Sequence, residues 1–154
     1  MSDPFIISID RLKGGAVQKI DTILASDFFD IHEADLSFAD AVKVSGEAYV
    51  ADEDLVLHLN ASTFAQIPCC ICNQWVSIPL IIKGYYYTES LANIATGFFD
   101  FRGPLREALL IELPKTAECK GSCPERKVIA PYLRKDAQPD VSTHYFPFND
   151  LKLP

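Results

Sequence analysis

Two close pairs of cysteines constrain the fold of this chain more than any other feature of its sequence. Cys69 and Cys72 stand in a C-x-x-C spacing within residues 67–79, IPCCICNQWVSIP, and Cys119 and Cys123 form a C-x-x-x-C pair in ECKGSCP. Four thiols in two pairs can supply a tetrahedral Zn²⁺ site, in which each pair closes a small loop on the ion and the two loops join distant parts of the chain. Cys70 is then the spare thiol, because neighbouring residues of an extended segment point to opposite sides.

Other uses of the cysteines stay open at this point. A redox C-x-x-C pair is typical of a strand-to-helix turn, but Cys72 runs into NQWVSIPLII, which is typical of a strand. A catalytic cysteine needs a histidine base, and none of His32, His58 and His144 has a local context that indicates one. Buried cysteines can also act as small apolar side chains. An odd number of cysteines, five, favours thiols or thiolate ligands over a disulfide framework.

The apolar pattern predicts an α+β fold in one domain. Extended, β-type patterns occupy residues 5–9, 41–50 and 75–87, and a further strand pattern begins at Leu55, where leucines alternate with other residues. One helix is predicted at residues 104–112, because a proline suits its first turn and apolar residues follow at helical spacing. We therefore expect an antiparallel β-sheet or a partly open barrel, few helices, and an irregular C-terminal arm pinned by the metal site.

Charge is unevenly distributed along the chain, whose net charge is −7. Residues 1–100 carry five Lys and Arg against fourteen Asp and Glu, whereas residues 101–154 carry nine against seven. An acidic surface repels nucleic-acid phosphates and attracts basic partners, although such acids also simply keep a protein in solution. The first residues, MSDPFIISIDRLKGG, lack the features of a signal peptide and no apolar run reaches membrane-spanning length, which predicts a cytoplasmic protein.

Three stretches resemble the bacterial and plastid DUF177 proteins, also called the YceD family. CCICNQW is similar to the cysteine pair of the family, FDFRGPLREALLIELP to its acid-led helix with a Leu-Pro end, and CKGSCP to its C-x-G-L-C-P signature. The chain departs from the family pattern at Ile71, where arginine is usual, and at Ser122, where leucine is usual. The resemblance implies one DUF177-like domain over residues 1–154, with an acidic strand-rich part (1–66), a cysteine-bearing part (67–125) and an irregular tail (126–154).

The resemblance also implies a function. Family members support accumulation of large-subunit (23S) ribosomal RNA, hence ribosome biogenesis, and many bind zinc through cysteines. The resemblance implies that the zinc ligands in this chain are Cys69, Cys72, Cys119 and Cys123. No enzymatic activity is implied, and the sequence contains no Gly-rich phosphate loop, H-E-x-x-H or G-x-S-x-G motif. The alternative is a thiol- or metal-responsive regulatory binding protein that uses Cys70.

Two kinds of macromolecular partner fit this function. The acidic part can hold a basic ribosomal protein, which the charge favours slightly, or a basic region can contact pre-ribosomal RNA. Neither a membrane nor a small-molecule substrate is indicated. Among the aromatics, residues 85–87 and 98–99 are expected to lie mainly in the core, because alternate strand residues face opposite sides. The candidate partner-binding residues are Arg102, Arg106, Lys115, Lys120, Arg126, Lys127, Arg134 and Lys135.

Overall fold

The computed structural model describes residues 3–132. The chain divides into two compact units, Met1–Cys123 and Pro124–Pro154, which are described separately. Within the second unit, α3 (Arg126–Ile129) is followed by a 3-10 turn, η4 (Ala130–Tyr132). The predicted irregular tail, 126–154, therefore begins with short helical turns, and its residues 133–154 lie outside the described part of the chain.

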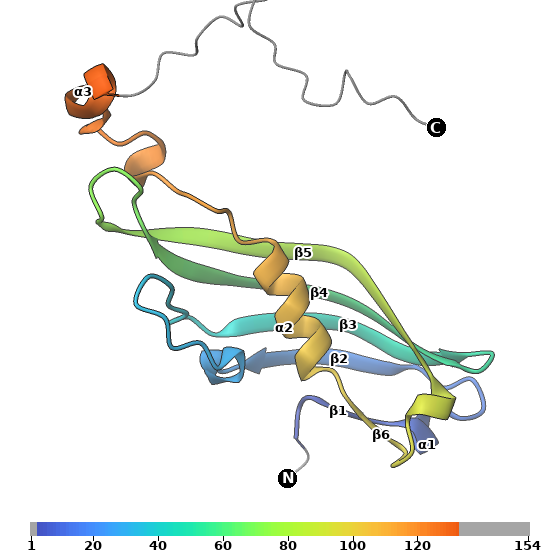
Figure 1. Cartoon of the computed structure of the whole chain (residues 1–154). Helices are drawn as coiled ribbons and strands as arrows, with labels where there is room; N and C mark the ends of the chain where they lie inside the picture. Colours follow the sequence, from blue (N-terminus) through green and yellow to red (C-terminus); the bar gives the residue numbers. More distant parts are fainter. Residues whose placement is uncertain (1–2, 133–154) are drawn as a thin grey trace, which may run out of the picture. The chain divides into compact units, whose positions relative to one another are not determined.

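A four-stranded antiparallel sheet forms the centre of the first unit (Figure 1). Its spatial order is β2-β3-β4-β5, so each strand pairs with its neighbour in sequence. The strands are β2 (Gln18–Leu24), β3 (Val42–Ala51), β4 (Asp54–Pro68) and β5 (Trp75–Ser90). The predicted antiparallel sheet with few helices is confirmed, and among the described residues the sheet stays open rather than closing into a barrel.

Short elements complete the first unit. β1 (Ile6–Ser8) and β6 (Phe98–Asp100) pair antiparallel in a second sheet, and α1 (Ile9–Leu12) follows β1 directly. The longest helix, α2 (Arg102–Ile111), agrees with the predicted helix at 104–112 to within two residues at its start. Three 3-10 turns are η1 (Ser26–Phe29), η2 (Leu91–Asn93) and η3 (Cys119–Gly121).

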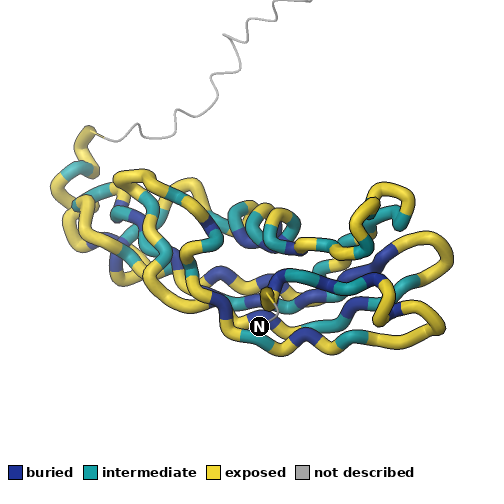
Figure 2. The backbone as a smooth tube through the Cα atoms, turned by 90° about the horizontal axis from the view of Figure 1, so that it is seen from below, coloured by how far each residue is buried: buried dark blue, intermediate teal, exposed yellow. Residues whose placement is uncertain are grey.

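The main core lies between α2 and one face of the sheet. Leu55, Leu57 and Leu59 of β4 point to this face and are fully buried, and Leu105 and Leu109 of α2 pack into the same cluster. Burial alternates along the strands, as Figure 2 shows by the succession of buried and more exposed residues. Because successive strand residues point to opposite faces, the other face of the sheet carries the more exposed side chains.

Parts of this architecture differ from the sequence-based expectation. β2 and β6 were not predicted, because β2 buries only Ile20 and Leu24 and β6 spans only three residues. The strand predicted at residues 75–87 extends further, because Thr88–Ser90 continue β5 through pairing with the start of β4. Within residues 3–132, no helix has the length and apolar character needed to span a bilayer.

Gly46 has a structural role that its position in a strand pattern does not reveal. The β3–β4 register continues unbroken through Gly46, which pairs with Leu59, so no bulge occurs there. Its φ is 155°, and a Cβ at this position would clash with the backbone carbonyl of His58 on β4. Glycine is therefore required for the close approach of these two strands.

Replacing Gly46 by alanine should destabilise the protein. The added methyl group forces β3 away from the His58 carbonyl, and we expect the free energy of unfolding to fall by about 1–3 kcal/mol in urea denaturation. Gly103 of α2 is the matched control, because a Cβ added there would have no atom within 4 Å. Gly103→Ala should leave stability unchanged or raise it by up to about 1 kcal/mol; equal losses in the two variants would contradict this account.

Candidate metal centre

The first cysteine pair lies at the tip of the hairpin formed by β4 and β5. The chain turns between Pro68 and Trp75, and two backbone hydrogen bonds fix the turn. The N–H of Cys69 donates to the carbonyl of Gln74 at 2.7 Å, and the N–H of Asn73 donates to the carbonyl of Cys69 at 3.0 Å. Asn73 has a φ of 60°, a left-handed conformation that asparagine adopts more readily than most residues.

The second pair follows α2 and is joined to the first by backbone pairing. Cys69 forms a parallel bridge with Ala117, and the N–H of Cys70 donates to the carbonyl of Ala117 at 2.9 Å. Cys119 begins η3, where Lys120 has a φ of 55° and turns the chain so that Cys123 returns toward the first pair. Backbone pairing alone thus holds the hairpin tip and the segment after α2 together.

The four predicted ligands converge. The Sγ atoms of Cys69, Cys72, Cys119 and Cys123 all lie within 4.8 Å of one another. Those of Cys72 and Cys119 are 3.6 Å apart. A tetrahedral ion with Zn–S bonds of about 2.3 Å separates its sulfur atoms by about 3.8 Å, so the cluster needs only a small contraction to hold one. The structure therefore places four cysteines close enough to bind a metal ion.

Burial favours this use of the cluster. Cys69, Cys119 and Cys123 are buried and Cys72 is half-buried, with Ile71 and Val76 packed against them. A carboxylate also takes part in the local structure, since the backbone N–H of Cys123 donates to Glu118 Oε2 at 3.0 Å. Sequence reasoning missed Glu118, although its place directly before the second cysteine pair was the available signal.

The cluster shifts the pKa values of two of its thiols in opposite directions. Burial raises the pKa of the Cys69 thiol, but backbone hydrogen bonds from Cys72, Cys119 and Ile71 outweigh burial and lower its pKa from 9.0 to about 6. Hydrogen bonding to Cys123, followed by burial, raises the pKa of Cys119 to about 12. The hydrogen bonds from its neighbours therefore favour the thiolate form of Cys69, and thiolates are the form that binds metals.

Cys70 stands apart from the cluster, as expected, but for a different reason. It is exposed and is not one of the four converging cysteines. Residues 69–72 form a turn rather than an extended segment, so strand alternation does not explain where Cys70 points. The turn itself directs Cys69 and Cys72 inward and leaves Cys70 outside.

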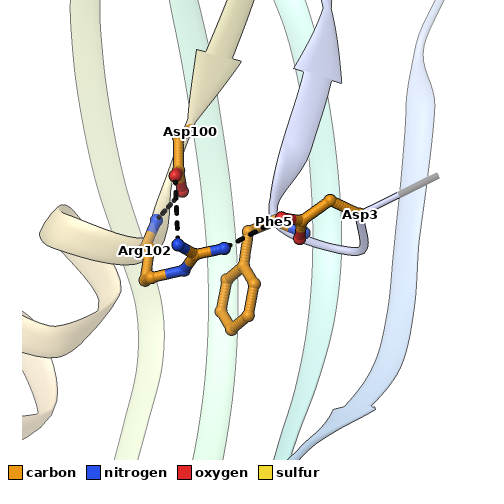
Figure 3. Close-up of polar contacts among 4 residues, drawn as sticks. All are labelled: Asp3, Phe5, Asp100 and Arg102. Carbon is orange, nitrogen blue, oxygen red and sulfur yellow. Dashed lines mark hydrogen bonds and ion pairs between the residues drawn. The ribbon is translucent and has the colours of Figure 1, made fainter. Parts of the chain in front are cut away.

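Arg102, one of the predicted partner-binding residues, makes intramolecular contacts (Figure 3). One guanidinium nitrogen donates to Asp3 Oδ2 at 2.9 Å, and another lies 3.7 Å from Asp100 Oδ2. The guanidinium carbon lies 4.5 Å from the centre of the Phe5 ring. This side chain thus ties the N-terminal segment to the end of β6 and the start of α2.

The remaining predicted cations do not form one surface in the described chain. Arg106 donates through Nε to the carbonyl of Phe29 at 2.7 Å, which joins α2 to η1. Lys115 and Lys120 are exposed on the segment after α2. Of the other four, Arg126 and Lys127 belong to the second unit and are exposed, and Arg134 and Lys135 lie outside the described residues.

Comparisons with known proteins identify no relative. No family model, no curated protein and no solved structure matches this chain. The resemblance to the DUF177 proteins therefore rests on the three sequence stretches alone, and it stays a prediction.

The two environments of the cysteines predict two classes of thiol reactivity. In the native protein, exposed Cys70 should react promptly with an aromatic disulfide reagent, while the four clustered thiols react slowly because they are buried or half-buried. Cys70→Ser should remove the fast phase and leave the slow phase unchanged, as followed by absorbance. Several thiols reacting as fast as Cys70 before denaturation would show that the cluster is not formed.

Proposed function

We propose that the four-cysteine cluster holds one Zn²⁺ ion with a structural role. The observation that carries this proposal is the convergence of four Sγ atoms within 4.8 Å from two distant parts of the chain. Thiolates are the preferred ligands of structural zinc, and an all-cysteine set leaves no open position on the ion for a substrate. The bound ion would offset two of the four negative charges of the thiolates and would fasten the β4–β5 hairpin tip to the segment after α2 that carries Cys119 and Cys123.

Zinc binding is directly testable by native mass spectrometry. The purified protein should carry one zinc ion, and Cys69→Ser or Cys123→Ser should lose it, with a fall in thermal midpoint of roughly 10 °C. Because the ion binds thiolates, zinc held at pH 7 should be released as the pH falls and protons compete for the sulfur atoms.

Cys70→Ser is the matched control for the ligand variants, since it changes a neighbouring cysteine that lies outside the cluster. It should keep both the zinc ion and the thermal midpoint. A metal-free protein that is folded and equally stable would contradict the structural role.

We further propose that the protein is a non-enzymatic, cytoplasmic ribosome biogenesis factor that supports accumulation of 23S ribosomal RNA. The support is the resemblance of three stretches to the DUF177 proteins, in the same order and with two of them bearing the cysteines that converge. A closed metal site fits a binding protein better than a hydrolase, because metal-assisted hydrolysis needs an open coordination position.

A groove on the first unit supports a basic ribosomal protein as a partner. The groove, of about 1030 Å³, is lined by apolar side chains together with Asp27, Asp30 and Asp100. Arg102 and Arg106 also line it, but both contact other groups of the chain. Asp100 is itself paired with Arg102, so Asp27 and Asp30, beside the apolar side chains, are the groups that suit the lysine- and arginine-rich segments of ribosomal proteins.

A second candidate function is a thiol- or metal-responsive regulatory binding protein. The observation that favours it is an exposed thiol, Cys70, in the same turn as the lowered-pKa thiol of Cys69. Oxidation of these thiols by an external oxidant would alter the metal site and, as a result, the structure of the hairpin tip. The thiol reactivity of Cys70 separates the two functions, since a thiol of ordinary reactivity argues against a sensor.

Capture of the tagged protein from its native cells tests the assembly role. Large-subunit RNA and its proteins should be recovered, and loss of the protein should lower the ratio of 23S to 16S RNA. Half of the sample is treated with RNase before washing. Recovery that vanishes with RNase indicates contact with RNA, whereas one basic ribosomal protein that survives indicates a protein partner. Recovery of neither, with an unchanged RNA ratio, would overturn the proposed function.

A further inference from the structure

The face of the main sheet that points away from α2 carries most of the positive charge of the acidic half. Residues 1–100 contain five Lys and Arg. The strand register places three of them on this outer face: Lys19 opposite Glu47, Lys43 opposite Ser62, and Lys83 in the next step of β5 after Ile81. The other two, Arg11 and Lys13, lie in α1 and directly after it.

The acids are sparse on the same face. Asp21 and Glu47 lie among the lysines, and Asp54 lies at the far end of β4, six residues from Asn60 and thus about 20 Å away along the strand. Most of the fourteen acids of residues 1–100 therefore lie elsewhere. The outer face is locally far less acidic than the composition of its sequence suggests.

A hollow of about 360 Å³ lies in the middle of this face, between Lys43 and Lys83. Small polar side chains, Ser45, Asn60 and Ser62, line it together with one carboxylate, that of Asp21, and leave room between the two lysines. It lies where β5 departs from regular pairing with β4, between Leu59 and Ala61. The two ammonium groups outnumber the single carboxylate of Asp21, so the hollow has a local excess of positive charge beside the serine hydroxyl groups, which suits a phosphate group.

The irregular pairing is fixed by Gly84 together with Asn60, a residue that lines the hollow. Gly84 has a φ of 63°, a conformation that favours glycine, and its N–H donates to Asn60 Oδ1 at 2.8 Å. The extra residue in β5 changes the register while Ile82 stays buried and Lys83 stays exposed. The bulge thus builds the hollow and presents the lysine at its rim.

Exposed aromatic rings lie on both sides of the hollow. On one side, the rings of His58 and Tyr86 stack in parallel, with centroids 4.2 Å apart, and Tyr86 is 61% exposed. On the other side lies Phe64, which is 47% exposed. Along β4, residues 58, 60, 62 and 64 all point to the outer face, so aromatic, polar, polar and aromatic side chains follow one another in a row.

We propose that this outer face binds single-stranded RNA, with a phosphate between Lys43 and Lys83 and bases stacked on Tyr86 and Phe64. Flat aromatic faces beside cationic groups are the usual means of holding unpaired bases without strict sequence preference. The choice of RNA over single-stranded DNA rests on the proposed function in ribosome biogenesis. Binding is expected to be salt-sensitive. It does not require a positive net charge of the whole protein, because the phosphates contact only the local positive charge.

The test uses the purified full chain and a fluorescently labelled 12-nucleotide RNA without secondary structure. Anisotropy should report binding at low salt, with log K falling against log salt at a slope of about −0.7 for the one phosphate contact. The only tryptophan, Trp75, pairs with Pro68 at the end of the same strands, so its fluorescence gives a second, label-free readout.

Charge reversal separates the outer face from the general charge of the protein. Lys43→Glu with Lys83→Glu should weaken RNA binding at least about tenfold and flatten the salt dependence. Arg11→Glu with Lys13→Glu changes the net charge equally, outside the sheet, and should weaken binding less than threefold. Tyr86→Ala should weaken binding about tenfold, whereas Tyr86→Phe, which keeps the ring, should not. Thermal unfolding of each variant verifies that it folds.

The outcomes separate this inference from the proposed function. No RNA binding by the wild-type protein, or equal losses in the two charge-reversal pairs, overturns the RNA-binding face even if loss of the protein still lowers 23S RNA. Conversely, the proposed function fails if RNA binds as expected but 23S RNA is unaffected in cells. A basic protein bound to the same face would bind more tightly after Lys43→Glu with Lys83→Glu, the opposite sign, and this result also overturns the inference.

Discussion

The antiparallel pairing of β4 with β5 is the constraint on which the rest of the structure depends. Its register places Leu55, Leu57 and Leu59 on the face that packs against α2, and the alternate residues of both strands on the other face. Its turn carries Cys69 and Cys72 at the tip. A shift of one residue would move the core leucines to solvent and the cysteines out of reach of the second pair. The core, the outer face and the cysteine cluster are therefore specified together.

The cysteine cluster makes this arrangement sensitive to ionisation. A thiolate at Cys69 is stabilised by backbone N–H groups, while Cys119 retains its proton in the absence of an ion. The four cysteines would hold a metal ion as thiolates, so binding would release the proton of Cys119. The parallel bridge between Cys69 and Ala117 already brings the two pairs together, so a bound ion would strengthen an existing contact.

Much of the fold and all four cysteines of the candidate site could be predicted, because both have local signals. Alternation of apolar residues marks β3, β4 and β5, and helical spacing marks α2. β2 lacks such a signal, since its stability comes from pairing with β3 rather than from its own apolar residues. The contacts of Arg102 with Asp3 and Phe5 could not be predicted either, because they join residues about a hundred positions apart. The cysteine ligands could be predicted without these contacts, because two short cysteine pairs can meet in many different folds.

Net charge indicates which partners a protein can bind only once the fold shows how the charged residues are distributed over its surfaces. From composition alone, an acidic chain is predicted to bind RNA poorly. This prediction assumes that the charge is evenly distributed over the surface. In this fold, strand alternation and the β5 bulge at Gly84 place Lys43 and Lys83 together on one face. Charges separated by more than a Debye length of about 10 Å are largely screened, so a phosphate at the hollow would respond mainly to Lys43, Lys83 and the single carboxylate of Asp21. The sheet register, rather than the sum of charges, therefore decides which partner this surface can accept.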